Sequence, residues 1–194
     1  CNNSKNMTGI VLNKSETSVK FSNELLHLDI DIFLKKMYSE LDLDYPKFFK
    51  MDNLCKLGMI GTELLYRNNI ELFNNKKKIG IILQNKSSSL DTDIKHQDGI
   101  RKKSVSPATF VYTLPNIVIG EISIKHKWQS EGVFFINEEL DYELLSQYSN
   151  ILLNGNRTEI NIVGWVEVFK NQFKLHLGIL AKSTSTEKLK EALS

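Results

Sequence analysis

The sequence predicts a single α/β domain over residues 1–194, a layered α/β/α arrangement built on a mixed five-stranded sheet. Short apolar runs alternate along the chain with longer segments of helical periodicity, which is typical of strands and helices in α/β layers. Two alternating runs near the C-terminus, residues 158–169 and 172–181, indicate a half-exposed antiparallel hairpin. A chain of 194 residues is long enough for one domain with a substantial core. Its hydrophobic fraction of 41% is ordinary for a globular protein.

The N-terminal third should hold one strand and two helices. The apolar run Met7–Leu12 predicts a buried strand, whereas residues 15–23 fit either a loop or an edge hairpin. Apolar residues at helical spacing predict an amphipathic helix over residues 28–41. Asp52 is a good N-cap for a second helix over residues 53–67.

That second helix contains two glycines, Gly58 and Gly61. Each glycine costs a helix about 1 kcal/mol, and such a cost predicts that another backbone passes close by. A buried strand is expected at Ile79–Leu83, where β-branched residues dominate. Residues 84–103 are polar and lack strong periodicity, so we expect a long mobile or functional connection.

The stretch 106–141 is predicted to contain a loop, a buried helix, a short buried strand and the start of another helix. Thr113 is expected to cap the first helix, and the apolar residues within 117–124 surround its axis, as in a buried helix. The strand is Val133–Ile136, and residues 140–153 form the amphipathic helix after it.

A sharp turn, Asn137-Glu138-Glu139, joins that strand to the following helix. Several α/β enzyme families place a nucleophile at such a turn, but this chain has two carboxylates. They fit an ordinary helix start, with an N-cap and an acidic first turn. They also fit a functional carboxylate at this turn.

Charge and composition argue against several classes of partner. A formal charge of +2 is too small to indicate binding to nucleic acid. No apolar run reaches the ~18 residues of a membrane span, so no membrane partner is expected either. His, Cys, Asp and Glu show no metal-binding spacing, and the glycines form no phosphate-binding loop. We therefore expect no metal and no cofactor.

The two cysteines, Cys1 and Cys55, do not form a disulfide framework, which favours a reduced cytoplasmic location. Cys55 falls in an apolar helical pattern and should pack as a small hydrophobic residue. The chain begins at Cys1 without a methionine. Either its true start is missing or the cysteine carries a lipid.

Four segments stand in the order found in one enzyme family. They are Lys47–Asp52, the stretch from Ser106-Pro107 through Asn116 to Ile119-Gly120, Val133–Ile136 with Asn137-Glu138-Glu139, and Val163-Gly164-Trp165-Val166-Glu167. In these segments the chain resembles the N-terminal half of a β-ketoacyl-acyl-carrier-protein synthase, which has the thiolase-like fold. It most resembles the short synthase-like proteins of bacterial aryl-polyene and flexirubin-type pigment clusters.

The resemblance departs at the residues that carry the family's chemistry. Glu139 stands at the position of the nucleophilic cysteine. The histidines do not match the family's catalytic histidines, which lie in a C-terminal half that has no counterpart here; they are His27, His96, His126 and His176. The resemblance therefore implies no catalytic residue. It implies a catalytically silent subunit, chain-length-factor-like or a scaffold, in fatty-acid or polyketide biosynthesis of the aryl-polyene type.

The resemblance also implies partners. The family's counterpart of the Val133–Ile136 strand pairs across a dimer two-fold, so the partner is an active synthase or a second copy of this chain. The expected interface residues are Val133, Phe134, Phe135 and Ile136. A basic cluster is a candidate contact for the acidic acyl carrier protein; it consists of Arg101, Lys102 and Lys103.

Two other functions fit the same residues. The chain could be an enzyme in its own right, a malonyl-carrier-protein decarboxylase or an acyl hydrolase that uses Glu139. It could also be a generic interaction module that has inherited only the fold of a synthase.

Overall fold

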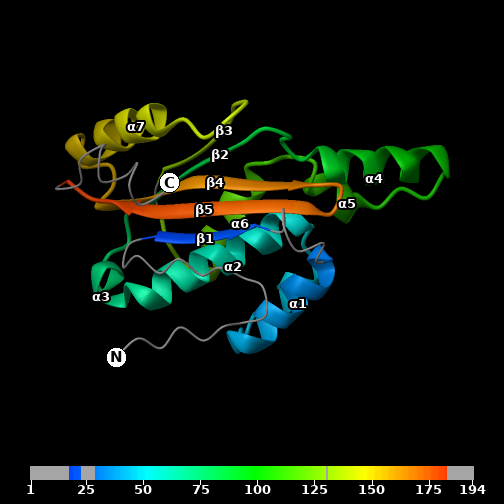
Figure 1. The fold of residues 1–194 in the computed structure, drawn as a ribbon, viewed down its shortest axis with the longest axis horizontal. Coiled ribbons are helices and arrows are strands. Elements are labelled where there is room, and N and C mark those ends of the chain that lie inside the picture. The colour runs from blue at the N-terminus through cyan, green and yellow to red at the C-terminus, as the bar shows by residue number, and fades with distance from the viewer. Residues whose placement is uncertain (1–17, 23–28, 130, 183–194) are drawn as a thin grey trace.

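Five strands form one mixed sheet in the computed structural model, which describes residues 18–22, 29–129 and 131–182 (Figure 1). Their order is β1 (Ser18–Ser22), β5 (Gln172–Leu180), β4 (Ile160–Phe169), β2 (Ile79–Asn85) and β3 (Gly132–Ile136). Strand β2 runs parallel to both of its neighbours, whereas β5 runs antiparallel to β4 and β1. The predicted α/β class, the mixed five-stranded sheet and the C-terminal hairpin are confirmed.

Helices cover both faces of this sheet (Figure 1). One face carries α1 (Ile30–Glu40), α2 (Asn53–Asn68) and α6 (Ile117–His126), and the other carries α7 (Tyr142–Asn154). Short helices occur at η1 (Pro46–Lys50), α3 (Ile70–Phe73) and α5 (Pro107–Val111). The longer helix α4 (Leu90–Arg101) extends away from the sheet beside α5 (Figure 1).

Helix α2 is the centre of the larger hydrophobic core. Asp52 caps it as predicted, because its carboxylate accepts a hydrogen bond of 2.9 Å from the Cys55 backbone N–H. A Cβ at Gly58 would lie 2.4 Å from the Val118 side chain, and one at Gly61 would lie 2.4 Å from that of Leu175. Helix α2 therefore lies close to α6 and β5 at its two glycines, as expected, and the nearest atoms there belong to side chains.

Three local expectations differ from the structure for physical reasons. Residues 84–103 are not a mobile connection but contain α4, and only Thr92 of that helix is buried, so no apolar stripe marked it. Strand β5 is mostly buried, because helix α2 packs on it. Strand β3 is half-exposed, because it lies at the sheet's edge.

Helix α6 also differs in detail from its prediction. It begins after Asn116, so Thr113 does not cap it. Its residue Ile124 is 62% exposed, which shows that the apolar circumference is not buried on every side. The predicted strand Met7–Leu12 and the expected helix or tail from Ser185 to Leu193 lie outside the described residues.

Candidate functional site

The parallel strands β2, β3 and β4 end at one edge of the sheet, and ligands of open α/β sheets bind outside such carboxyl ends. The predicted turn after β3 lies at this edge. Asn137 N donates a hydrogen bond of 2.9 Å to Asn85 O, which continues the pairing of β3 with β2 by one residue. A ligand of this sheet would therefore bind at this edge.

Helix α7 begins later than the sequence indicated. Its N-cap is Asp141, whose carboxylate accepts a hydrogen bond of 2.9 Å from the Leu144 N–H. The buried amide of Gln84 holds this cap, donating to Asp141 O at 3.3 Å and accepting from Asp141 N at 2.9 Å. Glu139 is exposed and precedes the cap by two residues, so its carboxylate is outside the first turn of α7.

The neighbouring Glu138 has a different contact. Its carboxylate forms an ion pair with Lys86 Nζ at 2.5 Å. The hydrogen bond to Glu138 raises the pKa of Lys86. Both side chains are largely exposed, so this pair adds little to stability. Glu138 thus serves to tie the turn to the end of β2.

Glu167, near the end of β4, is the most enclosed carboxylate at this edge. Its Oε2 accepts hydrogen bonds from Lys86 N at 2.7 Å and Ser87 N at 3.3 Å. Its Oε1 and the Asn137 Nδ2 are both buried, and neither has a hydrogen-bond partner among the described residues. By the strand register, Asn137 and Glu167 flank Lys86 on opposite sides. The sequence offered one signal for Glu167, its place at the end of the Val163–Glu167 segment that carries the resemblance.

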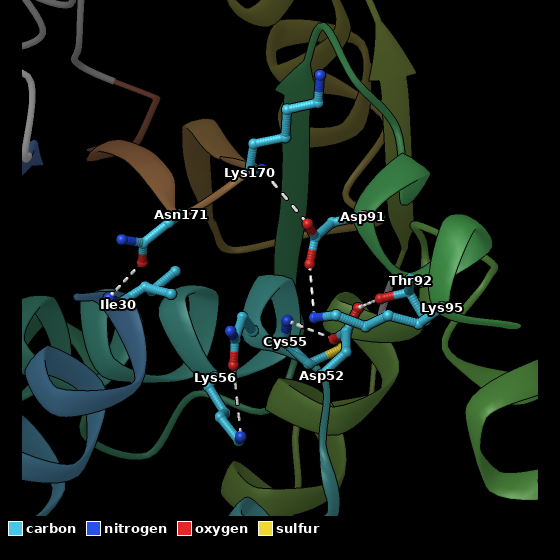
Figure 2. Close-up of polar contacts among 10 residues, drawn as sticks. Ile30, Asp52, Cys55, Lys56, Asp91, Thr92, Lys95, Lys170 and Asn171 are labelled. Atoms are coloured by element: carbon cyan, nitrogen blue, oxygen red, sulfur yellow. Dashed lines mark hydrogen bonds and ion pairs between the residues drawn. The ribbon is translucent and has the colours of Figure 1, made fainter. Parts of the chain in front are cut away.

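A separate cluster of polar side chains joins α2 to α4 (Figure 2). The Asp52 carboxylate accepts from Cys55 N and, at 2.8 Å, from the Thr92 hydroxyl. Nearby, Asp91 accepts from Lys95 Nζ at 2.7 Å and from Lys170 N at 3.3 Å. Burial raises the pKa of Asp52. These bonds fix α4 and the β4–β5 turn against the start of α2.

Cys55 is the one free thiol in the described part of the chain, and it is buried. Burial raises the pKa of this thiol well above its usual value, and the nearby Asp52 raises it further. A thiol that stays protonated is a poor nucleophile. The prediction that Cys55 packs as a small hydrophobic residue is confirmed.

Two buried carboxylates, Glu63 on α2 and Glu121 on α6, hold helices to their neighbours. Glu63 accepts from Arg67 Nε and Lys125 Nζ, each at 2.6 Å. Burial raises the pKa of Glu63, but these two hydrogen bonds outweigh it, and the net pKa is lowered. Glu121 pairs with Lys47 Nζ at 2.8 Å and accepts from the Tyr112 hydroxyl at 3.1 Å. Both carboxylates are fully engaged in holding the helices together.

His126 follows Lys125 at the end of α6 and is enclosed by aromatic rings. It stacks on Trp128, with ring centroids 4.3 Å apart and planes 15° apart. Burial and the Lys125 charge lower its pKa to about 4. The imidazole is therefore neutral at pH 7, and its contact of 3.4 Å with Glu63 is not an ion pair at that pH.

The basic cluster predicted as a carrier-protein contact lies at the far end of α4. Arg101 is the last residue of the helix, Lys102 is its C-cap, and Lys103 has a positive φ of 53°. All three are exposed, and Arg101 Nη1 lies 3.4 Å from the Asp98 carboxylate. The structure does not bring this cluster to the turn that carries Glu139.

The predicted interface strand β3 presents one free edge. In the described part of the chain, β2 is its only strand neighbour. Ile136 is 50% exposed, and the other three predicted interface residues are partly exposed. The Phe135 ring packs edge-on against Tyr148 of α7, with centroids 5.6 Å apart. This edge therefore offers apolar side chains and unpaired backbone groups together.

Two absences hold for the part of the chain that the structure describes. No helix there is long and apolar enough to cross a membrane. No group of three His, Cys, Asp or Glu side chains there is arranged to hold a metal ion.

Comparison with known proteins identifies the fold. No protein-family model matches the chain, and a search of curated proteins finds no match. Among solved structures, the chain is similar to the ishigamide ketosynthase/chain length factor, with a TM-score of 0.58 and 15% identity. That match covers 73% of this chain and 46% of the other.

Two further structures show the same likeness. One is the ketosynthase ApeO in complex with its chain length factor ApeC from Xenorhabdus doucetiae, with a TM-score of 0.52, 12% identity, and coverage of 74% of this chain and 63% of the other. The other is AntDE:AntF, a type II polyketide synthase acyl-carrier protein in complex with its ketosynthase bound to the hexaketide. Its TM-score is 0.54 at 12% identity, and it covers 85% of this chain and 60% of the other.

These matches define the fold of the protein. The chain has the thiolase-like α/β fold of ketosynthases and chain length factors, as its sequence predicted. It spans about half to three-fifths of the length of the chains it matches. At identities of 12% to 15% the likeness concerns the fold, and function has to be argued from this chain's own residues.

Proposed function

We propose that this protein is a catalytically silent, chain-length-factor-like or scaffold subunit that assembles with a β-ketoacyl-acyl-carrier-protein synthase or with a second copy of itself. The observation that carries the proposal is the free edge of β3, an apolar strand with one strand neighbour in the described fold. An exposed apolar strand edge is a template for pairing with another chain.

A second exposed surface supports an assembly. Among the residues that the structure describes, half of the exposed large hydrophobic side chains fall between residues 90 and 114, on α4, α5 and their connections. They are Leu90, Ile94, Ile100, Val105, Phe110, Val111 and Leu114. We call this region the α4–α5 arm. Apolar surface concentrated on an arm that extends from the body favours burial against another subunit.

The proposed lack of catalytic activity is supported by the chemistry of the residues at the turn. Glu139 stands where the resemblance places the nucleophilic cysteine, and its side chain is exposed. A carboxylate is a weak acyl acceptor, since its acyl product is a labile anhydride. The thiol of Cys55 is buried and protonated, so it does not replace the missing nucleophile.

The proposed partner and pathway are suggested by the complexes that the similar solved structures form. Two of the similar structures are complexes of a ketosynthase, one with a chain length factor and one with an acyl-carrier protein. In our proposal this protein takes part in fatty-acid-like or polyketide synthesis in the cytoplasm, of the aryl-polyene or flexirubin type. The Arg101–Lys103 cluster would meet the acidic carrier protein, because its three cationic side chains are exposed.

The test is assembly. Purified protein is examined alone and mixed with a β-ketoacyl-acyl-carrier-protein synthase from the same cells, and the mass of the particle is measured by analytical ultracentrifugation. We expect a heterodimer or homodimer that Ile136→Asp and Phe110→Asp each abolish, because the new charge would be buried at the interface. Ile32→Asp, at an equally exposed residue of α1, is the control and should assemble normally. A wild-type protein that stays monomeric and binds neither synthase nor carrier protein would leave only the generic interaction module.

The enzyme alternative is tested separately with malonyl-carrier protein as substrate. The silent subunit should release no carbon dioxide, and neither malonyl nor acyl thioester should be hydrolysed. Carbon dioxide or free acid that disappears in Glu139→Ala but persists in Glu138→Ala would establish a decarboxylase or hydrolase that uses Glu139. The neighbouring glutamate is a matched control because both carboxylates are exposed on the same turn.

A further inference from the structure

A recess of about 620 Å³ opens at the edge of the sheet opposite the turn that carries Glu139. At this edge β2 and β4 begin side by side, with Ile79 paired to Ile160, and β5 ends beside them. The segments that lead into β2 and β4, together with the segment that leaves β5, line the recess. A ligand bound here would lie away from β3's carboxyl end, so the site is separate from the proposed function.

The recess carries positive charge. Its lining includes three lysines, Lys77, Lys78 and Lys182, and a single carboxylate, Glu159. Across the described residues, none of these lysines takes part in an ion pair. Three cationic groups around one hollow without a carboxylate partner attract an anion of matching charge.

The single carboxylate in the recess holds the backbone. Glu159 Oε2 accepts hydrogen bonds from Lys77 N at 3.3 Å and from Lys78 N at 3.2 Å, while Glu159 N donates to Lys78 O at 2.8 Å. Gln129 N donates to Lys77 O at 2.9 Å. The backbone that carries the two lysines is thus fixed before any ligand arrives, which lowers the cost of binding.

Thr158 supplies the second, independent observation. It lines the recess and is only 2% exposed, yet its Oγ1 has no hydrogen-bond partner among the described residues. A buried hydroxyl without a partner costs free energy, and an oxygen of a bound anion would accept its hydrogen. At the rim, Lys182 Nζ donates to Asn156 Oδ1 at 2.9 Å, which holds that ammonium group beside the recess.

We propose that this recess binds a small phosphate-bearing molecule with two or more negative charges. The ammonium groups of Lys77, Lys78 and Lys182 neutralise the phosphate oxygens, and the Thr158 hydroxyl donates one hydrogen bond to them. Within the described fold, no aromatic side chain lines the recess. The charge of the ligand, rather than a stacked ring, therefore carries recognition.

The test is binding of inorganic pyrophosphate to the full chain, measured by isothermal titration calorimetry at low salt, with inorganic phosphate as a second probe. We expect one site that weakens as salt rises. Lys77→Ala and Lys78→Ala should each weaken binding about tenfold, the loss of one charge-assisted hydrogen bond. Lys102→Ala and Lys103→Ala, an exposed basic pair outside the recess, are the controls and should bind as the wild type does.

A third variant separates binding from folding. Thr158→Val keeps the shape of the side chain and removes the orphan hydroxyl, so the protein should unfold at equal or higher urea while pyrophosphate binds more weakly. The proposal is overturned if wild-type protein binds no pyrophosphate at millimolar concentration, or if the control pair weakens binding as much as the recess lysines. Thr158→Val protein that binds as tightly as the wild type, or citrate that binds as tightly as pyrophosphate, would also overturn it.

Discussion

The hydroxyl of Thr92 donates a hydrogen bond of 2.8 Å to the carboxylate of Asp52, across 40 residues of sequence. The same carboxylate caps α2 by accepting from Cys55 N. Thr92 is the one buried residue of α4, so this bond and the cap share one acceptor at the join between α4 and the core. The stability of the cap and the position of α4 are therefore coupled.

We predict that Asp52→Ala lowers the free energy of unfolding by about 2–3 kcal/mol, since it removes the cap and leaves the Thr92 hydroxyl buried without an acceptor. Thr92→Val alone should cost about 1 kcal/mol. The double variant should lose less than the sum, because both changes remove the same bond. Urea denaturation measures all three. Asp29→Ala, which removes an exposed cap from α1, should cost at most about 1 kcal/mol, and strictly additive losses would disprove the coupling.

Substitution by alanine should have opposite effects on stability at two glycines. Gly164 has a φ of 151°, and a Cβ there would lie only 1.9 Å from the backbone oxygen of His176 on β5. Gly164→Ala should therefore cost about 3 kcal/mol or more. Gly120 lies exposed in α6, and a Cβ there meets no atom within 4 Å. Gly120→Ala should stabilise by up to about 1 kcal/mol. Thermal melting compares them, and equal effects would contradict the reported geometry.

The free energy of unfolding should decrease as the pH is lowered, because His126 titrates. Its pKa is lowered to about 4 in the fold from an ordinary value of 6.5, so the unfolded chain binds the proton more tightly. The stabilisation is fully present above pH 6.5 and is lost as pH falls toward 4. By linkage its full size is about 3 kcal/mol.

Urea denaturation at pH 7 and pH 5 measures this slope. His126→Gln cannot gain a proton, so its free energy of unfolding should change less between the two pH values, whatever it loses from the stack on Trp128. An unchanged slope in His126→Gln would refute the assignment.

Removing one partner of the buried ion pair between Glu63 and Lys125 should lower the free energy of unfolding more than removing both. Glu63→Leu leaves the Lys125 ammonium, whose side chain is 16% exposed, without its partner. We predict a loss of about 3–5 kcal/mol. Lys125→Leu combined with Glu63→Leu should recover most of this loss, because no isolated charge stays buried. A double variant as unstable as Glu63→Leu would show that the carboxylate acts mainly through Arg67.

The sequence predicted those elements whose burial is visible in a local pattern of apolar residues. Helix α2 has a cap and an apolar stripe, and β2 begins with a continuous apolar run over residues 79–83, so both were found close to their bounds. Helix α4 was missed because its one buried residue, Thr92, is polar. An apolar run such as β3 says that a strand forms, but its place at the edge depends on strands distant in the sequence.

The site was harder to predict than the fold, because distant residues select among local alternatives. Asn137 and Asp141 both follow β3 closely, and either could cap the next helix. Gln84, 57 residues earlier, selects Asp141 by holding its backbone with two hydrogen bonds. The recess likewise joins Lys77, Thr158 and Lys182 from separate segments, and no local pattern marks their convergence.

In the assembly that we propose, the exposed edge of β3 would make the protein depend on the timing of synthesis. Until a partner covers it, each new copy displays unpaired strand groups beside aromatic side chains, the features that proteases and chaperones recognise in orphan subunits. Copies made in excess of the partner should be cleared, and copies made in step with it should persist. The amount of this protein in a cell would then follow the supply of its partner more closely than its own rate of translation.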